Sequence, residues 1–320
     1  MKALFWIAMW LLLSTLGVAA ADVPAGVGAS AFSRIGIDGR PLAMGGAFVA
    51  VASERPVPYY NSAALLAAPR IGATAMYSRP YGPDFGITFQ DVCVYGRLDS
   101  QTGSARAIGV AAGWVGVSIS DIVVWDEDDP GSSETFTATS SIFSASVGVE
   151  LRHDLAVGCA VKYYHDAILE GRSRGLGVDL GLLGSFSLGG VPATVGANLM
   201  DVGRTRIQWH GTEGEPVNYV PWVNKIGASA VFGEGLVLAA CDLDWAVDRP
   251  ATEQRLRVGV EVNPVRWVFV RGGWSSDFAG KRTISGGVGL ELLRQLWLDY
   301  AYVPNSELGA THFVSMHVSF

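Results

Sequence analysis

The chain ends in the stretch Leu308-Gly309-Ala310-Thr311-His312-Phe313-Val314-Ser315-Met316-His317-Val318-Ser319-Phe320, in which two kinds of residue alternate up to a terminal aromatic. Successive side chains of a β-strand point to opposite faces, so this stretch predicts a strand with one mostly apolar and one mostly polar face. An edge strand of a soluble β-sandwich and the last strand of an outer-membrane β-barrel are both open interpretations. A strand that stops on Phe320 favours the barrel, with Phe320 as the expected assembly signal.

The other end of the chain indicates export. Met1 and Lys2 precede an apolar run over residues 3–13, and small residues follow up to Ala21. A charged start, an apolar run and a small-residue cleavage site are typical of a secretory signal peptide. We therefore expect residues 1–21 to be a signal peptide, with an uncleaved anchor as the alternative.

The composition also favours a barrel. Hydrophobic residues make up 49% of the chain and the mean hydropathy is +0.29. No stretch after the first reaches the roughly 18 apolar residues that a membrane-spanning helix needs. High hydropathy without long apolar runs is expected when lipid-facing residues alternate with lumenal ones.

Short alternating segments follow one another from residue 71 onward. They predict an all-β fold, a transmembrane antiparallel barrel of about fourteen strands. The expected strands are 71–77, 85–97, 106–118, 140–152, 155–165, 174–187, 192–201, 219–232, 235–245, 254–263, 265–274, 282–293, 295–303 and 308–320.

The connections support closure into a barrel. Tight turns are expected at one end, near residues 152–154 and 188–191 for example. Longer loops are expected at the other end, at 119–139, 166–173, 202–218, 246–253 and 275–281. This alternation is typical of barrels with short periplasmic turns and longer extracellular loops.

Several function classes are excluded by composition and motifs. The net charge of −7 provides no basic surface for nucleic acid. The cysteines, Cys93, Cys159 and Cys241, are too few and too far apart for a disulfide framework or a zinc site. No nucleophile elbow, phosphate loop or zinc-protease motif is present. We expect neither an enzyme nor a bound metal or cofactor.

Residues 28–70 do not alternate and carry two short motifs. Arg40-Pro41-Leu42-Ala43-Met44-Gly45-Gly46-Ala47 is the first, and Tyr60-Asn61-Ser62-Ala63-Ala64-Leu65 is the second. This run resembles the start of PorV/PorQ-type outer-membrane proteins and, more distantly, of the FadL-like transporter superfamily. The second motif departs from the family pattern, because Tyr60, Ser62 and Ala64 replace tryptophan, proline and glycine.

The resemblance implies a plug within the periplasmic mouth of the barrel. The expected division is a signal peptide (1–21), a plug segment (22–70) and the barrel (71–320). Met44, Gly45, Gly46 and Asn61 are the implied plug or gate residues. The alternative is that this segment is an inner strand or helix without a gating role.

The polar faces of the predicted strands supply charges of both signs to the lumen. Such charges could line a selective aqueous path or hold the plug through ion pairs. The candidate lumen-lining residues are Lys162, Asp179, Lys225, Arg255, Arg257, Glu261 and Glu291.

Two functions remain open for a protein expected in the cell outer membrane. The first is passive transport of hydrophobic or small amphipathic solutes through an apolar pocket, to which Phe48, Trp267, Phe269 and Phe313 could contribute. The second, implied by the PorV resemblance, is a type IX secretion component that binds exported proteins through its long loops. The expected partners are outer-membrane lipids, the barrel assembly machinery, and a hydrophobic solute or secreted proteins.

Overall fold

The structure is a computed structural model that describes residue 32 and residues 35–98, 107–124, 134–247, 254–277 and 280–320. The signal peptide predicted over residues 1–21 lies outside this described part. Among the described residues, no helix has the length and apolar character needed to cross a bilayer.

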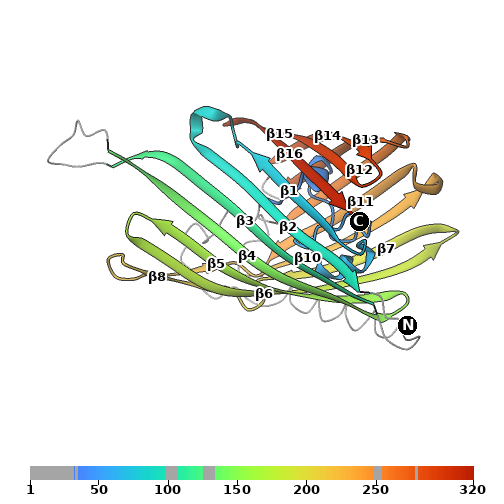
Figure 1. The fold of residues 1–320 in the computed structure, drawn as a ribbon, viewed down its shortest axis with the longest axis horizontal. Coiled ribbons are helices and arrows are strands. Elements are labelled where there is room, and N and C mark those ends of the chain that lie inside the picture. Colours follow the sequence, from blue (N-terminus) through green and yellow to red (C-terminus); the bar gives the residue numbers. More distant parts are fainter. Residues whose placement is uncertain (1–31, 33–34, 99–106, 125–133, 248–253, 278–279) are drawn as a thin grey trace.

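Fourteen antiparallel strands form a closed barrel, as predicted (Figure 1). The strands are β1 (Gly72–Ser78), β2 (Ile87–Leu98), β3 (Ile108–Val123), β4 (Thr135–Arg152), β5 (Leu155–Ile168), β6 (Gly171–Leu188), β7 (Val191–Met200), β10 (Val223–Phe232), β11 (Val237–Ala246), β12 (Arg255–Val265), β13 (Val268–Asp277), β14 (Arg282–Leu293), β15 (Leu296–Asn305) and β16 (Gly309–Ser319). Each pairs with its neighbours in the chain, and β1 pairs with β16.

The two faces of the barrel have opposite character. Val314 and Met316 of β16 are 52% and 44% exposed, whereas Ser315 and His317 are buried. In β12, Val258 is exposed on the outside while Glu261 is buried. A water-soluble sandwich buries its apolar face, so a sheet with its charges inside and its aliphatic side chains outside fits a bilayer.

Three of the predicted long loops are wrong in detail. β5 and β6 continue toward each other and leave a turn at Leu169 and Glu170, so no loop spans 166–173. Both ends of 119–139 belong to strands, since β3 and β4 pair out to Val123 and Thr135, and residues 125–133 lie outside the described part. Residues 202–218 contain a hairpin of β8 (Thr205–His210) and β9 (Val217–Val220), and β8 pairs with β6. Strand pairing satisfies backbone groups that a loop would leave to water.

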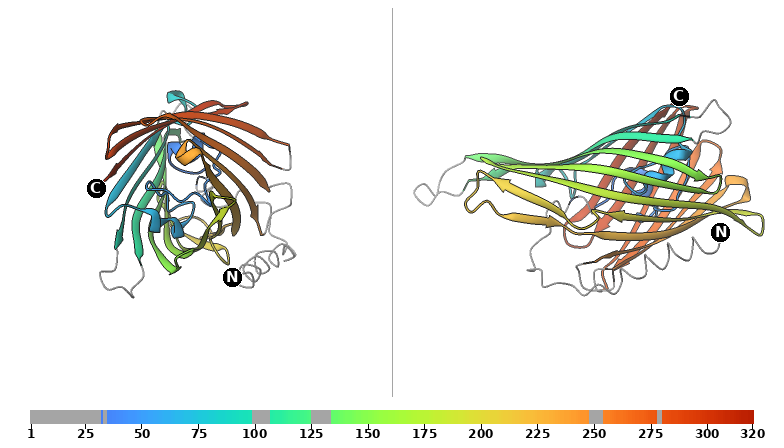
Figure 2. Two further views of the ribbon diagram at one scale, coloured as in Figure 1. Left: turned by 90° about the vertical axis from the view of Figure 1, so that its right-hand side faces the viewer. Right: turned by 90° about the horizontal axis from the view of Figure 1, so that it is seen from below.

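A segment of little regular structure lies inside the barrel. Residues 35–70 contain α2 (Gly39–Ala43) and η3 (Ser62–Ala67), and Figure 2 shows this blue segment enclosed by the ring of strands. We call residues 35–70 the plug segment. Two further short helical turns, η4 (Pro83–Phe85) and η5 (Gly233–Gly235), lie in connections between strands.

Candidate solute path between plug and barrel wall

The first motif forms a tight bend against the wall. Asp38 caps α2 by accepting a 2.9 Å hydrogen bond from the Arg40 backbone N–H group. Gly45 and Gly46 follow with φ values of +68° and +79°, which favour glycine. A Cβ atom on Gly45 would lie 2.9 Å from the backbone of Trp274. The two glycines therefore permit both the bend and the close approach, and Met44 beside them is fully buried.

Asn61 connects the two halves of the plug segment, the first around α2 and the second containing η3, and it also hydrogen-bonds to the barrel wall. Its side-chain oxygen accepts a 3.0 Å hydrogen bond from the Ala63 N–H group and thereby caps η3. Its amide nitrogen donates to the carbonyl oxygens of Val49 at 2.9 Å and Leu182 at 3.0 Å. The residue that the resemblance marks thus lies at a junction, and its role as a gate stays a prediction.

A row of glycines on the inner surface of the sheet packs against η3. Gly109, Gly148, Gly158 and Gly181 lie directly opposite one another on β3, β4, β5 and β6. A Cβ atom on Gly158 would lie 2.3 Å from the Ala63 backbone nitrogen. We call these four residues the glycine band. Without side chains there, the backbone of η3 reaches the inner surface of the sheet.

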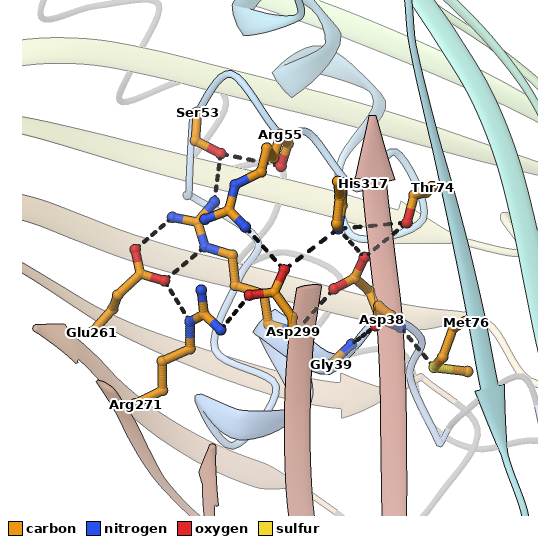
Figure 3. A network of polar contacts seen from close by, with 12 residues as sticks. Asp38, Gly39, Ser53, Arg55, Thr74, Met76, Glu261, Arg271, Asp299 and His317 are labelled. Atoms are coloured by element: carbon orange, nitrogen blue, oxygen red, sulfur yellow. Dashed lines mark hydrogen bonds and ion pairs between the residues drawn. The ribbon is translucent and has the colours of Figure 1, made fainter. Parts of the chain in front are cut away.

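An ion-pair network holds the first half of the plug segment, around α2, to the barrel wall (Figure 3). Arg40 makes two 2.8 Å hydrogen bonds to the two carboxylate oxygens of Glu261 on β12. Glu261 also accepts from Arg271 at 2.6 Å, and Arg271 reaches Asp299 on β15. Arg55 donates to the second oxygen of Asp299 at 2.9 Å. All five side chains are buried, so each charge depends on its partners.

Asp38 extends this network to β16. Its carboxylate lies 2.6 Å from Nε2 of His317 and accepts a hydrogen bond from Thr74. Burial by itself would raise the pKa of Asp38, but His317 and the Arg40 N–H group outweigh burial. The pKa therefore lies well below its ordinary value of 3.8.

Three potential metal ligands lie close together at this point. One ligand atom each from Asp38, Asp299 and His317 lies within 4.8 Å of the other two. Asp299 already accepts from Arg55 and Arg271, however, so its charge is matched. We interpret the three residues as members of the ion-pair network.

The predicted lumen-lining residues lie in separate places. Lys162 lies 2.7 Å from both Asp179 and Asp201, and the three side chains form one ion-pair cluster. Arg257 lies 2.7 Å from Asp244, and Lys225 lies 3.8 Å from the same carboxylate.

Arg257 also donates to the carbonyl oxygen of Gly45, so the second cluster touches the plug segment. Glu261 belongs to the ion-pair network described above. Glu291 lies on the inner parity of β14 and forms no ion pair with any described residue. Arg255 lines a small cavity with Lys225 and Arg257.

A second, larger cavity lies between the plug segment and β1–β6. Its surface is mainly apolar, and Val57, Val115 and Ile142 contribute to it. The aromatic residues expected around a pocket do not line it. Phe48 and Phe313 belong to the packed core, Phe269 lies 5.1 Å from the Arg55 guanidinium, and Trp267 is 58% exposed at a turn.

Phe320 lies at the end of β16. Its backbone N–H group donates to Ile71 at 2.8 Å, and its side chain is 66% exposed. An exposed terminal ring is available for recognition by another protein. Its role as an assembly signal stays a prediction.

Sequence reasoning missed the plug charges Asp38, Arg40 and Arg55, together with Arg271 and Asp201. A signal was available for the first three, because charged residues in a segment expected inside a barrel need partners of opposite sign. Asp299 shared the inner parity of its strand, but alternation alone does not say which plug residue meets it.

Among the comparisons with known proteins, the one with solved structures bears on the fold. No family model matches the chain, and no curated protein sequence matches it. Among solved structures, the Pseudomonas putida toluene transporter TodX is similar at a TM-score of 0.58 and 12% identity, over 88% of this chain and 97% of that one.

Two further structures are comparably similar. A Pseudomonas aeruginosa FadL homologue gives a TM-score of 0.58 at 11% identity, over 88% of this chain and 98% of that one. The Ralstonia pickettii toluene transporter TbuX gives 0.53 at 12% identity, over 90% of this chain and 100% of that one. At such identities the similarity establishes a FadL-like barrel fold, and the PorV/PorQ assignment is not confirmed.

Proposed function

We propose that this protein is an outer-membrane channel through which hydrophobic or small amphipathic solutes pass without an energy source. The observation that carries the proposal is the mainly apolar cavity between the plug segment and β1–β6. Ligand sites are typically concave and mostly apolar with a few polar groups, and this cavity has that character.

Two further observations support the proposal. The exposed aliphatic outer face fits lipid, and the fold is that of proteins described as toluene transporters. The plug segment lies inside the ring of strands, and we propose that it shifts when a solute passes. The structural neighbours are transporters and channels, and we propose no enzymatic activity.

The secretion alternative has less support. It needs partner-binding loops, but strands extend into both ends of 119–139, and 202–218 contains most of the β8–β9 hairpin. None of the three structures named above is described as a secretion component. Affinity isolation from the native envelope tests it directly, because a secretion component would be recovered with exported proteins.

A reversible lock tests whether the plug segment must move. An ideal Cβ atom on Gly39 lies 3.0 Å from the side-chain oxygen of Ser315, close to the spacing needed for a disulfide. The double variant Gly39→Cys and Ser315→Cys should therefore form a bond between α2 and β16. The background would carry serine in place of the three native cysteines.

Uptake of a labelled monoaromatic hydrocarbon is then measured in cells whose own hydrophobic channels are deleted. We expect uptake to fall to the level of empty cells when the lock is oxidised and to return after reduction. Each single-cysteine variant is the matched control. Equal uptake by the locked and reduced protein would contradict a moving plug, and no uptake by any form would contradict the channel.

A further inference from the structure

An acidic side chain lies without a partner on the wall of the larger cavity. Asp91 of β2 is 1% exposed, and neither of its carboxylate oxygens has a hydrogen-bond partner among the described residues. It lines the cavity together with Ile37 and Val57 of the plug segment and Ile142 of β4. A buried polar group left unpaired is costly, so a specific case asks for an explanation.

The neighbouring strands cannot supply a donor. Asp91 is paired with Met76 on β1 and with Val115 on β3, and neither side chain donates a hydrogen bond. Both flanking positions are thus apolar. The open side of the carboxylate is the cavity itself.

Nearby polar groups are already used. The Thr74 hydroxyl donates to Asp38 at 3.2 Å. Lys162, the cation that lines the same cavity, lies 2.7 Å from both Asp179 and Asp201. The Asp91 carboxyl group is therefore without a partner among the described residues, while Lys162 and Asp179, which line the same cavity, form an ion pair.

We infer that this cavity binds a small amphipathic amine, with the ammonium group against Asp91 and the apolar body against Val115 and Ile142. The inference rests on the proposed function and names the solute class for that path. A protonated amine provides both a positive charge and N–H donors, and a hydroxyl group provides only one donor. A carboxyl group and an amine together form a hydrogen-bonded ion pair, which a carboxyl group and an alcohol do not, so the unpartnered Asp91 favours the amine over the alcohol.

Three probes of nearly equal size separate the contributions. Toluene, benzyl alcohol and benzylamine share one ring and differ in a methyl, hydroxyl or ammonium-bearing group. Their affinities for the full barrel in detergent are measured by calorimetry at pH 7, where benzylamine is protonated. We expect benzylamine to bind about tenfold or more tightly than toluene, as a hydrogen bond to a charged group implies.

Three variants locate the effect. Asp91→Asn should remove the preference for benzylamine and leave toluene binding unchanged. Glu291→Gln, on the inner face of β14 outside this cavity, is the matched control and should keep the preference. Ser144→Leu fills the cavity from β4 and should weaken all three probes. Heat-modifiable migration on gels verifies that each variant has formed the barrel.

Each result decides the inference. A benzylamine preference that survives Asp91→Asn would contradict binding of the ammonium group at Asp91. An affinity for benzyl alcohol stronger than that for benzylamine would contradict it too. If Ser144→Leu does not change the binding of any probe, the cavity is not the binding site. If toluene binds and enters cells but benzylamine has no advantage, only the inference fails. If none of the three binds and hydrocarbon uptake is also absent, the proposed function fails with it.

Discussion

The two halves of the plug segment are held by different means. The first half, around α2, meets β12–β16 through charges, with Arg40 and Arg55 paired to carboxylates on the wall. The second half, η3, meets β3–β6 through the close approach of backbone to the glycine band. The first contact depends on ionisation in addition to the close approach at Gly45, whereas the second depends on the absence of side chains in the glycine band.

This difference separates the ways in which the plug segment can be released. Removing a partner from a buried ion pair leaves an uncompensated charge, which is strongly unfavourable. Adding a methyl group to the glycine band creates a steric conflict that pH does not change. Cleavage by chymotrypsin after Phe48 reports on the first half and cleavage after Tyr60 on the second, since both residues are buried when docked.

The largest effect is expected for Glu261→Ala. It removes both carboxylate contacts of Arg40 and one contact of Arg271, at a cost of about 3–5 kcal/mol to docking. Cleavage after Phe48 should increase strongly. Glu291→Ala is the matched control, because Glu291 shares the inner face without an ion pair to described residues. Equal protection in both variants would contradict a structural role for the network.

A smaller effect is expected for Gly158→Ala. The new Cβ atom would lie 2.3 Å from the Ala63 nitrogen, and overpacking of this kind costs about 1–3 kcal/mol. Cleavage after Tyr60 should increase more than cleavage after Phe48. In Gly184→Ala the nearest atom, on Val195, lies at 3.5 Å, so this control should behave as wild type. Similar cleavage in the two variants would argue against the glycine band.

Asn61→Ala should weaken the junction between the halves. Loss of the η3 cap costs about 0.5–2 kcal/mol, and the carbonyl groups of Val49 and Leu182 lose a donor. Both cleavage sites should become moderately more accessible. Asn218→Ala, in the exposed β9, is the control. Increased cleavage at one site only would show that Asn61 does not couple the halves.

The last effect depends on pH and concerns Asp38. Its pKa is lowered on docking, so its contribution to stability is present above the ordinary value of 3.8 and is lost as the pH falls below it. Protection of Phe48, measured with an acid-active protease, should fall as the pH drops below about 4. The difference between wild type and Asp38→Asn should shrink over the same range. A difference that grows on acidification would contradict this assignment.

Alternation along the strands was enough to predict the barrel, its strands to within a few residues, and its inner face. It was not enough to predict partners within the lumen. Glu261 was recognised as inward-facing, but the approach of Arg40 from a distant segment depends on the path of the plug segment. The glycine band was partly readable, because Gly148 and Gly158 lie at equal distances from the turn at His153 and must face each other.

The loops were predicted less well for a physical reason. Polar alternation continues past the membrane in β3–β6, so it does not mark where strand pairing stops. Composition suggested loops at 119–139 and 166–173, whereas hydrogen bonding to the adjacent strand extended the sheet into both. Tertiary pairing outweighed local propensity at these positions.

The glycine band also constrains the order in which the molecule can be put together. Its four residues form a continuous row only when β3, β4, β5 and β6 are in their final register. A slip of one residue turns the glycine to the outside and brings a neighbour such as Val147 or Val157 to the inside. Residues 35–70 are synthesised before these strands, and η3 can contact the glycine band only once all four strands are correctly aligned. Docking of η3 therefore depends on the register of β3–β6.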